Sequence, residues 1–175
     1  MELIRNGVFE TNSSSAHSLA YGTDYILRGS RWYRPTDEHD FSNPMYRLDA
    51  VPDEYKGYTF YEYLGEYGWG YNELLTPQQK FSYLLTQIAD TSEELHESTS
   101  YETIKEMIED IGCHIVPCND ESGYVDHESY GIVSTSLFKS KKDLITYLFN
   151  DNISVYIEND NDEYQEWYTG EKSEW

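Results

Sequence analysis

Positive charge is scarce in this chain. Lysine and arginine supply 12 of its 175 residues against 33 aspartates and glutamates, which leaves a formal net charge of −21. A protein with this charge repels nucleic acids and anionic membranes and attracts basic partners. We therefore expect neither nucleic acid nor membrane to bind directly. Solubility or salt adaptation alone would also favour such a charge, and the carboxylates would then be spread evenly over the surface.

Long apolar runs are missing as well. No run in the sequence approaches the roughly 18 residues that a membrane-spanning helix needs. The first residues, Met1–Asn6, lack the basic and apolar stretches of a secretion signal. Hydrophobic residues nevertheless make up 38% of the chain, which is enough for a folded core. We therefore expect a globular protein of the cytoplasm.

Cysteine occurs twice, at positions 113 and 118. The spacing matches neither a Cys-x-x-Cys redox pair nor a zinc knuckle, so we expect two reduced, partly buried thiols on or beside a strand. A metal site would need Cys113, His114 and Cys118 together with a distant ligand. We expect no metal and no other cofactor.

Three segments combine a residue that starts helices with apolar residues on one helical face. The first opens at Thr76–Pro77 and the third after Ser140. The second follows Thr99, with Glu102 in capping-box spacing, and Gly112 predicts its end. The apolar faces are Phe81, Leu84, Leu85 and Ile88 in the first helix, Ile104, Met107, Ile108 and Ile111 in the second, and Leu144, Ile145, Leu148 and Phe149 in the third.

The remaining patterned segments predict strands, and their order indicates an α+β fold: a mainly antiparallel sheet with about three helices packed on it. We expect one domain over residues 1–175. Within it, residues 28–75 form an irregular aromatic and acidic lobe with a short helix near 60–66, and residues 159–175 form a flexible acidic tail. The expected strands are 3–9, 17–21, 113–118, 124–127 and 152–157, with 113–118 and 124–127 joined as a hairpin by the turn residues 119–123.

Aromatic residues accompany the acids: they make up 16% of the chain, and 18 of them are tyrosine. Tyrosine and tryptophan are enriched at interfaces, so we expect a binding surface. An even spread over roughly 9,000 Å² would give about one charge per 400 Å², several-fold fewer than on DNA, so imitation of DNA requires clustered acids. The expected partner-binding residues are Glu102, Glu106, Glu109, Asp110, Asp53, Glu54, Tyr58, Tyr61, Glu62, Tyr63, Glu66 and Trp69.

A hydrolase or transferase is the alternative. The polar segment Thr11–Ser18, which we expect to be mostly loop, places hydroxyl groups close to a histidine, and a second histidine stands beside an aspartate. Such groups act together only if the fold brings them into one cleft. The residues that would carry the chemistry are Ser13, Ser14, Ser15, His17, Asp126 and His127.

The segment Arg5–Ser18, with the sequence RNGVFETNSSSAHS, resembles the N-terminal signature of a group of small proteins from phages and mobile elements of Firmicutes. Members of that group also tend to carry an Asp-His-x-Ser segment, here at 126–129, and an Asn-Asp-Asn ending, here within Asn159–Asp162. The resemblance implies a phage setting. A small, very acidic phage protein is similar in character to anti-CRISPR inhibitors. We therefore expect its partner to be the type II-A RNA-guided nuclease of the bacterial host, with or without guide RNA.

Overall fold

The computed structural model describes residues 15–21, 26–28, 31–33, 47–68, 72–92, 94–118, 123–125 and 138–159. These residues form three α-helices, α1 (Pro77–Asp90), α2 (Thr99–Asp110) and α3 (Lys141–Phe149). Two 3-10 helices accompany them, η1 (Asp53–Tyr55) and η2 (Leu95–Glu97). The strands are β1 (Ser15–Tyr21), β2 (Ile26–Arg28), β3 (Arg31–Tyr33), β4 (Thr59–Tyr61), β5 (Glu66–Tyr67), β6 (Asn72–Leu74), β7 (His114–Val116), β8 (Tyr124–Val125) and β9 (Ile153–Asn159).

The predicted α+β class with three helices is confirmed, although the sheets are small. The largest sheet has three strands in the order β1-β9-β6, and β9 is antiparallel to both neighbours. Strands β2 and β3 form an antiparallel hairpin. Two further pairs, β4 with β7 and β5 with β8, are parallel.

The predicted hairpin between residues 113–118 and 124–127 is wrong. β7 and β8 do not pair with each other, because each lies beside an earlier strand from the aromatic region. Ile115 stands opposite Phe60, and Val125 stands opposite Tyr67. Both pairings place apolar side chains against the core, and this burial outweighs the local turn signal.

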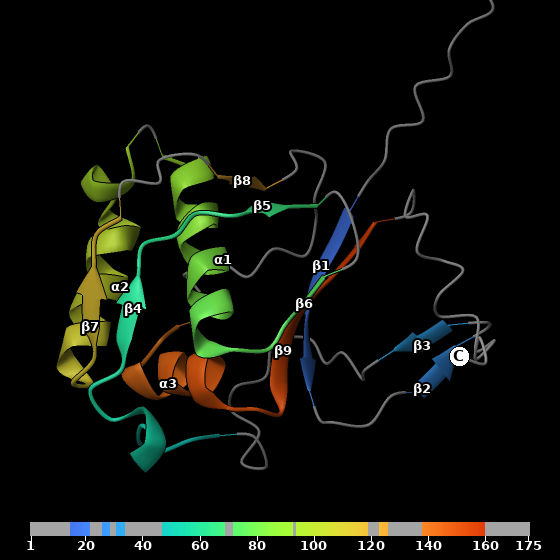
Figure 1. The fold of residues 1–175 in the computed structure, drawn as a ribbon, viewed down its shortest axis with the longest axis horizontal. Helices are drawn as coiled ribbons and strands as arrows, with labels where there is room; N and C mark the ends of the chain where they lie inside the picture. Colours follow the sequence, from blue (N-terminus) through green and yellow to red (C-terminus); the bar gives the residue numbers. More distant parts are fainter. Residues whose placement is uncertain are drawn as a thin grey trace, which may run out of the picture.

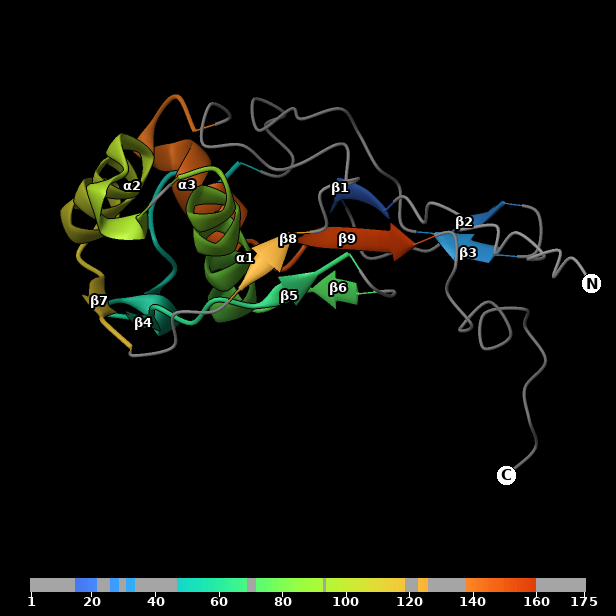
Figure 2. The ribbon, with the colours of Figure 1, turned by 90° about the horizontal axis from the view of Figure 1, so that it is seen from above.

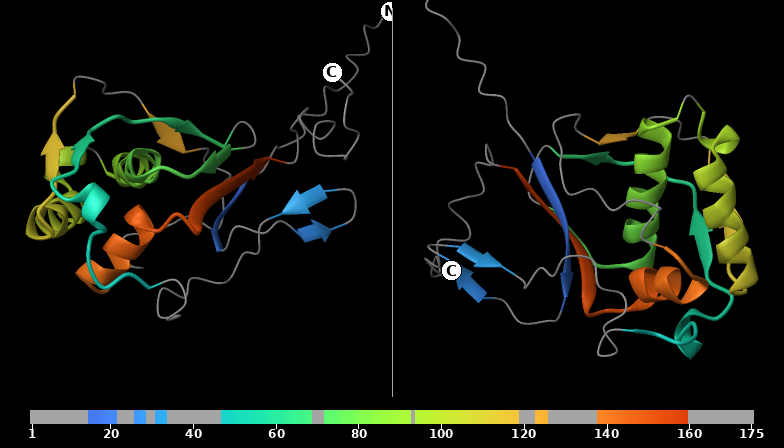
Figure 3. Two further views of the ribbon diagram at one scale, coloured as in Figure 1. Left: turned by 60° about the horizontal axis from the view of Figure 1, so that its bottom comes forward. Right: turned by 180° about the vertical axis from the view of Figure 1, so that it is seen from behind.

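Helix α1 is the centre of the fold (Figure 1). Every residue from Lys80 to Ile88 is buried, which is typical of a helix covered on all sides. It contacts α2, α3, β4 and β8, and α3 packs across its N-terminal end (Figure 3). There Lys80, 1% exposed, donates hydrogen bonds from Nζ to the carbonyl oxygens of Asn150 at 3.1 Å and Ile153 at 3.0 Å. In return, the Tyr147 hydroxyl donates to the carbonyl of Lys80 at 2.8 Å.

The helix starts agree with the sequence in two cases out of three. Thr76 caps α1 in a reciprocal capping box with Gln79, and the Ser140 hydroxyl accepts the Asp143 N–H at the start of α3. The capping box predicted at Thr99 and Glu102 is wrong. Thr99 is already the first helical residue, and its predecessor Ser98 occupies the cap without a side-chain hydrogen bond. The predicted stop at Gly112 is confirmed by its φ of 79°.

Part of region 28–75 is built into the core, through Phe60, Tyr67 and Leu74. Phe60 is fully buried and its ring packs against Phe81 of α1 with 4.6 Å between ring centroids. The short helix expected near 60–66 is wrong: residues 59–61 form β4 and residues 66–67 form β5. The expected strand at 3–9 and the tail after Asn159 lie outside the described residues. No helix in the described part of the chain is long and apolar enough to cross a membrane.

Candidate functional site

Helix α2 presents four exposed carboxylates on one side. Glu102, Glu106, Glu109 and Asp110 are all exposed, as predicted from the sequence. At 3.6 residues per turn they occupy an arc of about 100° around the helix axis. Residues 102 and 110 are eight positions apart, which corresponds to about 12 Å along the axis. The four charges therefore form one compact stripe, here called the α2 acidic face.

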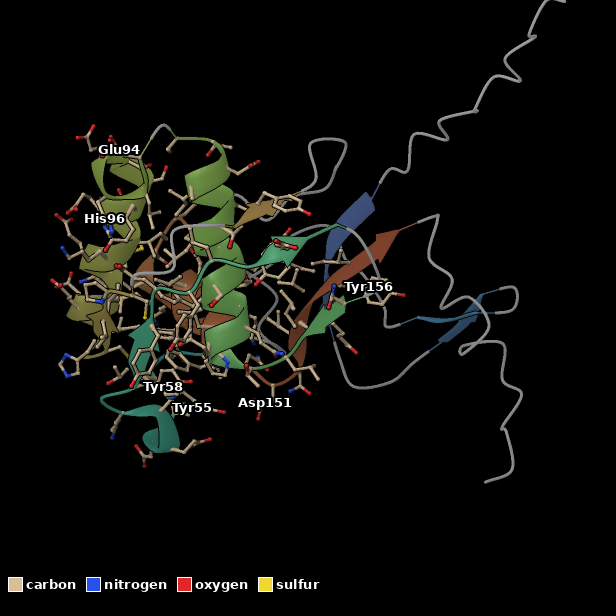
Figure 4. The ribbon with its side chains drawn as sticks, turned by 45° about the horizontal axis from the view of Figure 1, so that its top comes forward. Tyr55, Tyr58, Glu94, His96, Asp151 and Tyr156 are labelled. Carbon is tan, nitrogen blue, oxygen red and sulfur yellow. The ribbon has the colours of Figure 1, made fainter. Side chains whose placement is uncertain are left out.

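The 3-10 helix η2 extends this charge. Glu94 and Glu97 are also exposed, and η2 contacts α2. Figure 4 shows Glu94 and His96 together over α2, away from Tyr55 and Tyr58. Of the twelve exposed carboxylates in the described part of the chain, six lie between residues 94 and 110. Glu94 and Glu97 are not among the residues predicted to bind a partner, because they precede the helical pattern that defines the second helix.

Buried side chains hold the α2 acidic face in place. On the opposite side of the helix, Tyr101, Ile104 and Ile108 are 3%, 1% and 0% exposed. The helix lies beside β7 at the end of the molecule away from the β2–β3 hairpin (Figure 2). Because both ends of the stripe belong to a packed helix, the backbone positions that carry its carboxylates are fixed. Ordered charges lose less entropy on binding than mobile ones.

The Tyr101 hydroxyl donates a hydrogen bond to Oε1 of Glu62, which is 3% exposed. Burial raises the pKa of the Tyr101 phenol well above its usual value, and the hydrogen bond to Glu62 and the charges of Glu62, Glu102 and Glu109 add to this effect. The exposed residue His96 lies beside the Tyr101–Glu62 pair, with 3.7 Å between its Nε2 and Oε2 of Glu62. Through Glu62, the His96 contact ties η2, and the Tyr101 hydrogen bond ties α2, to the segment that follows β4.

Three of the four acids of α2 are placed where they cost helix stability, whereas Glu102 in the first turn suits the helix dipole. Glu102 and Glu106 are four residues apart, as are Glu106 and Asp110, and like charges at this spacing repel. Glu109 and Asp110 stand in the last turn, at the negative end of the helix dipole. Lys141 offsets part of this repulsion with an ion pair to Asp110 at 2.5 Å. An arrangement that costs helix stability indicates a purpose other than folding.

The other expected partner-binding residues are more scattered. Asp53 and Glu54 are exposed in η1, where Asp53 pairs with Lys56 at 2.5 Å, and Glu66 is exposed in β5. Tyr61 and Tyr63 are 43% and 46% exposed.

Three of the expected partner-binding residues are not among the exposed residues that the structure describes. Glu62 needs correction, since it is buried and its carboxylate faces Tyr101 and not a partner. Tyr58 is half-buried, with its ring against Phe60 at 4.8 Å. Trp69 lies outside the described residues.

The catalytic alternative rests on residues of which little is described. Ser15 and His17 belong to β1, opposite Asn159 and Ile157 of β9, so this part of the expected loop is strand. Their side chains, and the whole of Ser13, Ser14, Asp126 and His127, lie outside the described part. This reading therefore stays a prediction.

The two cysteines are free thiols in the described structure, and they flank β7 as predicted. Cys113 is buried, and this burial raises the pKa of its thiol. Cys118 is half-buried. In the described part of the chain, no group of three or more histidine, cysteine, aspartate or glutamate side chains is arranged to hold a metal ion.

Comparison with known proteins finds no match for this chain among protein-family models, curated proteins or solved structures.

Proposed function

We propose that this protein is an inhibitor that binds a basic surface of a host enzyme through the α2 acidic face. The observation that carries the proposal is the stripe Glu102–Glu106–Glu109–Asp110: four exposed carboxylates held by a packed helix at a cost to that helix. Carboxylates serving solubility alone would not need to be gathered in this way. The net charge of −21 makes a basic partner the natural complement.

The geometry supports imitation of a nucleic-acid backbone. Four carboxylates over about 12 Å of helix axis give about one carboxylate per 3–4 Å, of which Asp110 is paired with Lys141. One strand of duplex DNA carries a phosphate every ~3.4 Å along its axis. The α2 acidic face thus reaches locally the charge density that an even spread over the whole surface does not reach. A groove that binds nucleic acid through lysine and arginine is the surface that such a stripe complements.

The resemblance to small phage proteins suggests the setting and the first target. In this proposal the protein acts in the cytoplasm of an infected bacterium and occupies the nucleic-acid groove of the type II-A RNA-guided nuclease, which blocks DNA binding or cleavage. The protein itself binds neither nucleic acid nor membrane, since both carry the same sign of charge. It needs no cofactor for this task, because binding alone excludes the DNA.

A pull-down with salt titration tests the proposal. The type II-A nuclease with its guide RNA is presented to the immobilised protein at low and at high salt, beside a panel of restriction and other defence nucleases. We expect capture at low salt that weakens steeply as salt rises, because the contacts are charge–charge contacts. If no nuclease in the panel is retained at low salt, the proposal is wrong.

The same titration separates this function from salt adaptation. A protein whose acids serve only salt tolerance retains no nuclease at any salt concentration. Half of the exposed carboxylates in the described part gather on η2 and α2, which favours a binding surface over an even distribution.

A further inference from the structure

Two exposed tyrosines form a stacked pair after β4. The rings of Tyr61 and Tyr63 have centroids 5.8 Å apart and planes inclined by 21°. Each of the two residues remains more than two fifths exposed, at 43% and 46%. Val116, 40% exposed, stands opposite Tyr61 in the β4–β7 pairing. Together these three residues make an apolar, aromatic patch, here called the tyrosine platform.

The platform is on a different side of β4 from α2. Along residues 59–63 the side chains alternate, with Phe60 and Glu62 at 0% and 3% exposure and Tyr61 and Tyr63 outward. Of the two inward side chains, Phe60 packs against Phe81 of α1, and Glu62 accepts the hydrogen bond from Tyr101 of α2. The platform is therefore a second surface, distinct from the α2 acidic face.

Hydrogen bonds fix the backbone of the platform. The N–H of Tyr61 donates to Oε1 of Gln78 at 2.9 Å, and Nε2 of Gln78 donates back to the carbonyl of Tyr61 at 2.8 Å. The N–H of Tyr63 donates to the same carbonyl at 2.8 Å, and the N–H of Glu62 donates to the carbonyl of Val116 at 3.1 Å. The buried bond from Tyr101 to Glu62 anchors the segment from within. The backbone that carries the two rings is therefore preorganised for binding.

The strands of the platform belong to stretches of sequence that are rich in acids. Residues 57–79 and 106–138, which supply the strands of both parallel pairs, contain no lysine or arginine but ten aspartates and glutamates, three in the first segment and seven in the second. Glu66, exposed and three residues after Tyr63, is the nearest of these acids in sequence that the structure describes as exposed on this stretch, and the net charge of −21 favours the approach of a cation over that of an anion. Nucleobases also stack on tyrosine, but their phosphates are repelled by the same charge.

We propose that the tyrosine platform binds arginine side chains of a basic protein partner, an inference that rests on the proposed function and specifies its partner. A guanidinium group is planar and weakly hydrated, so it stacks on an aromatic face while carrying the charge that the acidic surroundings attract. A lysine side chain gains less binding energy from contact with an aromatic ring, because its ammonium group is compact and strongly hydrated. The platform selects arginine-rich surfaces, and the α2 acidic face attracts positive charge of either kind.

Two fluorescently labelled peptides, hexa-arginine and hexa-lysine, test this selection in the full-length protein at low salt. The quantity to follow is the ratio of their affinities, since arginine also pairs better with carboxylates in general. We expect Y61L/Y63L to weaken hexa-arginine binding about three- to fivefold and to leave hexa-lysine binding nearly unchanged. Y61F/Y63F keeps the rings and should keep the ratio. Tyr124→Leu, which changes an exposed tyrosine outside the pair, should also keep it, and thermal unfolding checks that each variant folds.

The outcomes separate the platform from the proposed function. If Y61L/Y63L leaves the ratio unchanged while both peptides bind, the platform inference is overturned and the proposed function stands. If neither peptide binds the wild-type protein, the proposed function fails and the inference fails with it. If hexathymidylate binds and Y61L/Y63L abolishes that binding, the platform is a nucleobase site and the inference is wrong.

Discussion

The hydroxyl of Tyr101 donates a hydrogen bond to the buried carboxylate of Glu62, and each residue is only 3% exposed. This bond joins the first turn of α2 to the segment between β4 and β5. One side of the joint carries the α2 acidic face and the other carries the tyrosine platform. The position of both surfaces therefore depends on a pair of residues that neither surface exposes.

Removal of the Tyr101 hydroxyl should weaken the fold. Tyr101→Phe leaves Oε1 of Glu62 without this donor, and a buried acceptor that loses its partner costs about 1–3 kcal/mol. The measurement is the free energy of unfolding from urea denaturation. Tyr61→Phe removes a hydroxyl from an exposed ring and should change it by less than about 0.5 kcal/mol. Equal effects of the two substitutions would contradict the assigned role of the Tyr101 bond.

Lys80 should be needed for stability although it lies far from either surface. Its Nζ bonds the carbonyls of Asn150 and Ile153, where α3 ends and β9 begins. Lys80→Met keeps most of the apolar stem but removes both hydrogen bonds. The Asn150 carbonyl keeps the Ile153 N–H at 3.1 Å, whereas the Ile153 carbonyl loses this donor, so we expect a loss of about 1–3 kcal/mol in unfolding free energy. Lys105→Met on α2 is the matched control and should cost much less, since Lys105 is half-exposed. A Lys80→Met protein as stable as wild type would refute this assignment.

Alkaline pH should destabilise the protein. Burial raises the pKa of Tyr67 from 10.0 to about 12, and it raises the pKa of Tyr147 further still. A raised pKa in the folded state stabilises the fold below the unfolded pKa, and this contribution disappears as pH rises through the folded pKa. For Tyr67 the loss falls between pH 10 and about 12 and amounts to about 2–3 kcal/mol. Urea denaturation across this window measures it.

The matched variant for the pH experiment is Tyr67→Phe. It removes the ionisable group, so its unfolding free energy should fall less steeply above pH 10 than that of the wild type. Tyrosinate absorbance should also show a group of phenols that ionise only as the protein unfolds. A flat unfolding free energy across the window, with all phenols ionising near pH 10, would show that these rings are not buried.

Neutralising the acids of α2 should stabilise the helix. Glu106→Gln with Glu109→Gln removes the like-charge pairs of Glu106 with Glu102, Glu109 and Asp110 and one charge at the negative end of the helix dipole. It also removes the favourable pair of Lys105 with Glu109, so we expect a net gain of about 0.5 kcal/mol in unfolding free energy. Glu66→Gln, an exposed acid in β5, serves as control and should change little. A loss of stability in the double variant would mean that the carboxylates support the fold, and the argument for a binding role would lose its basis.

Local signals in the sequence predicted the helices well, because capping residues and apolar spacing act within one element. Thr76–Pro77 and Gly112 marked boundaries that the structure confirms. The exposure of Glu102 and Glu106 followed from the same spacing. Only the start of α2 was wrong, by one residue, since Thr99 and Ser98 are both residues that favour a cap.

Pairings between distant segments could not be predicted in the same way. Nothing local indicates that residue 60 stands beside residue 115, or that the carboxylate of Glu62 meets Tyr101. The alternation of residues 59–63 is a strand signal, but the glycines and aromatic residues that follow obscured it. The two-residue alternation of a strand over residues 59–63 predicts Glu62 on the buried side and Tyr61 and Tyr63 on the exposed side.

The most direct test of the central claim compares two variants of equal charge. Glu102→Gln, Glu106→Gln, Glu109→Gln and Asp110→Asn together neutralise four acids, so the net charge becomes −21 + 4 = −17. Truncation after Asp160 removes five acids and one lysine, which also gives −21 + 5 − 1 = −17. The measurement is the affinity of each variant for the type II-A nuclease with its guide RNA at low salt. The account predicts a loss of about tenfold or more for the helix variant and a much smaller loss for the truncation, because fixed carboxylates bind better than tail charges. Loss of binding on truncation, with wild-type affinity in the helix variant, would contradict it.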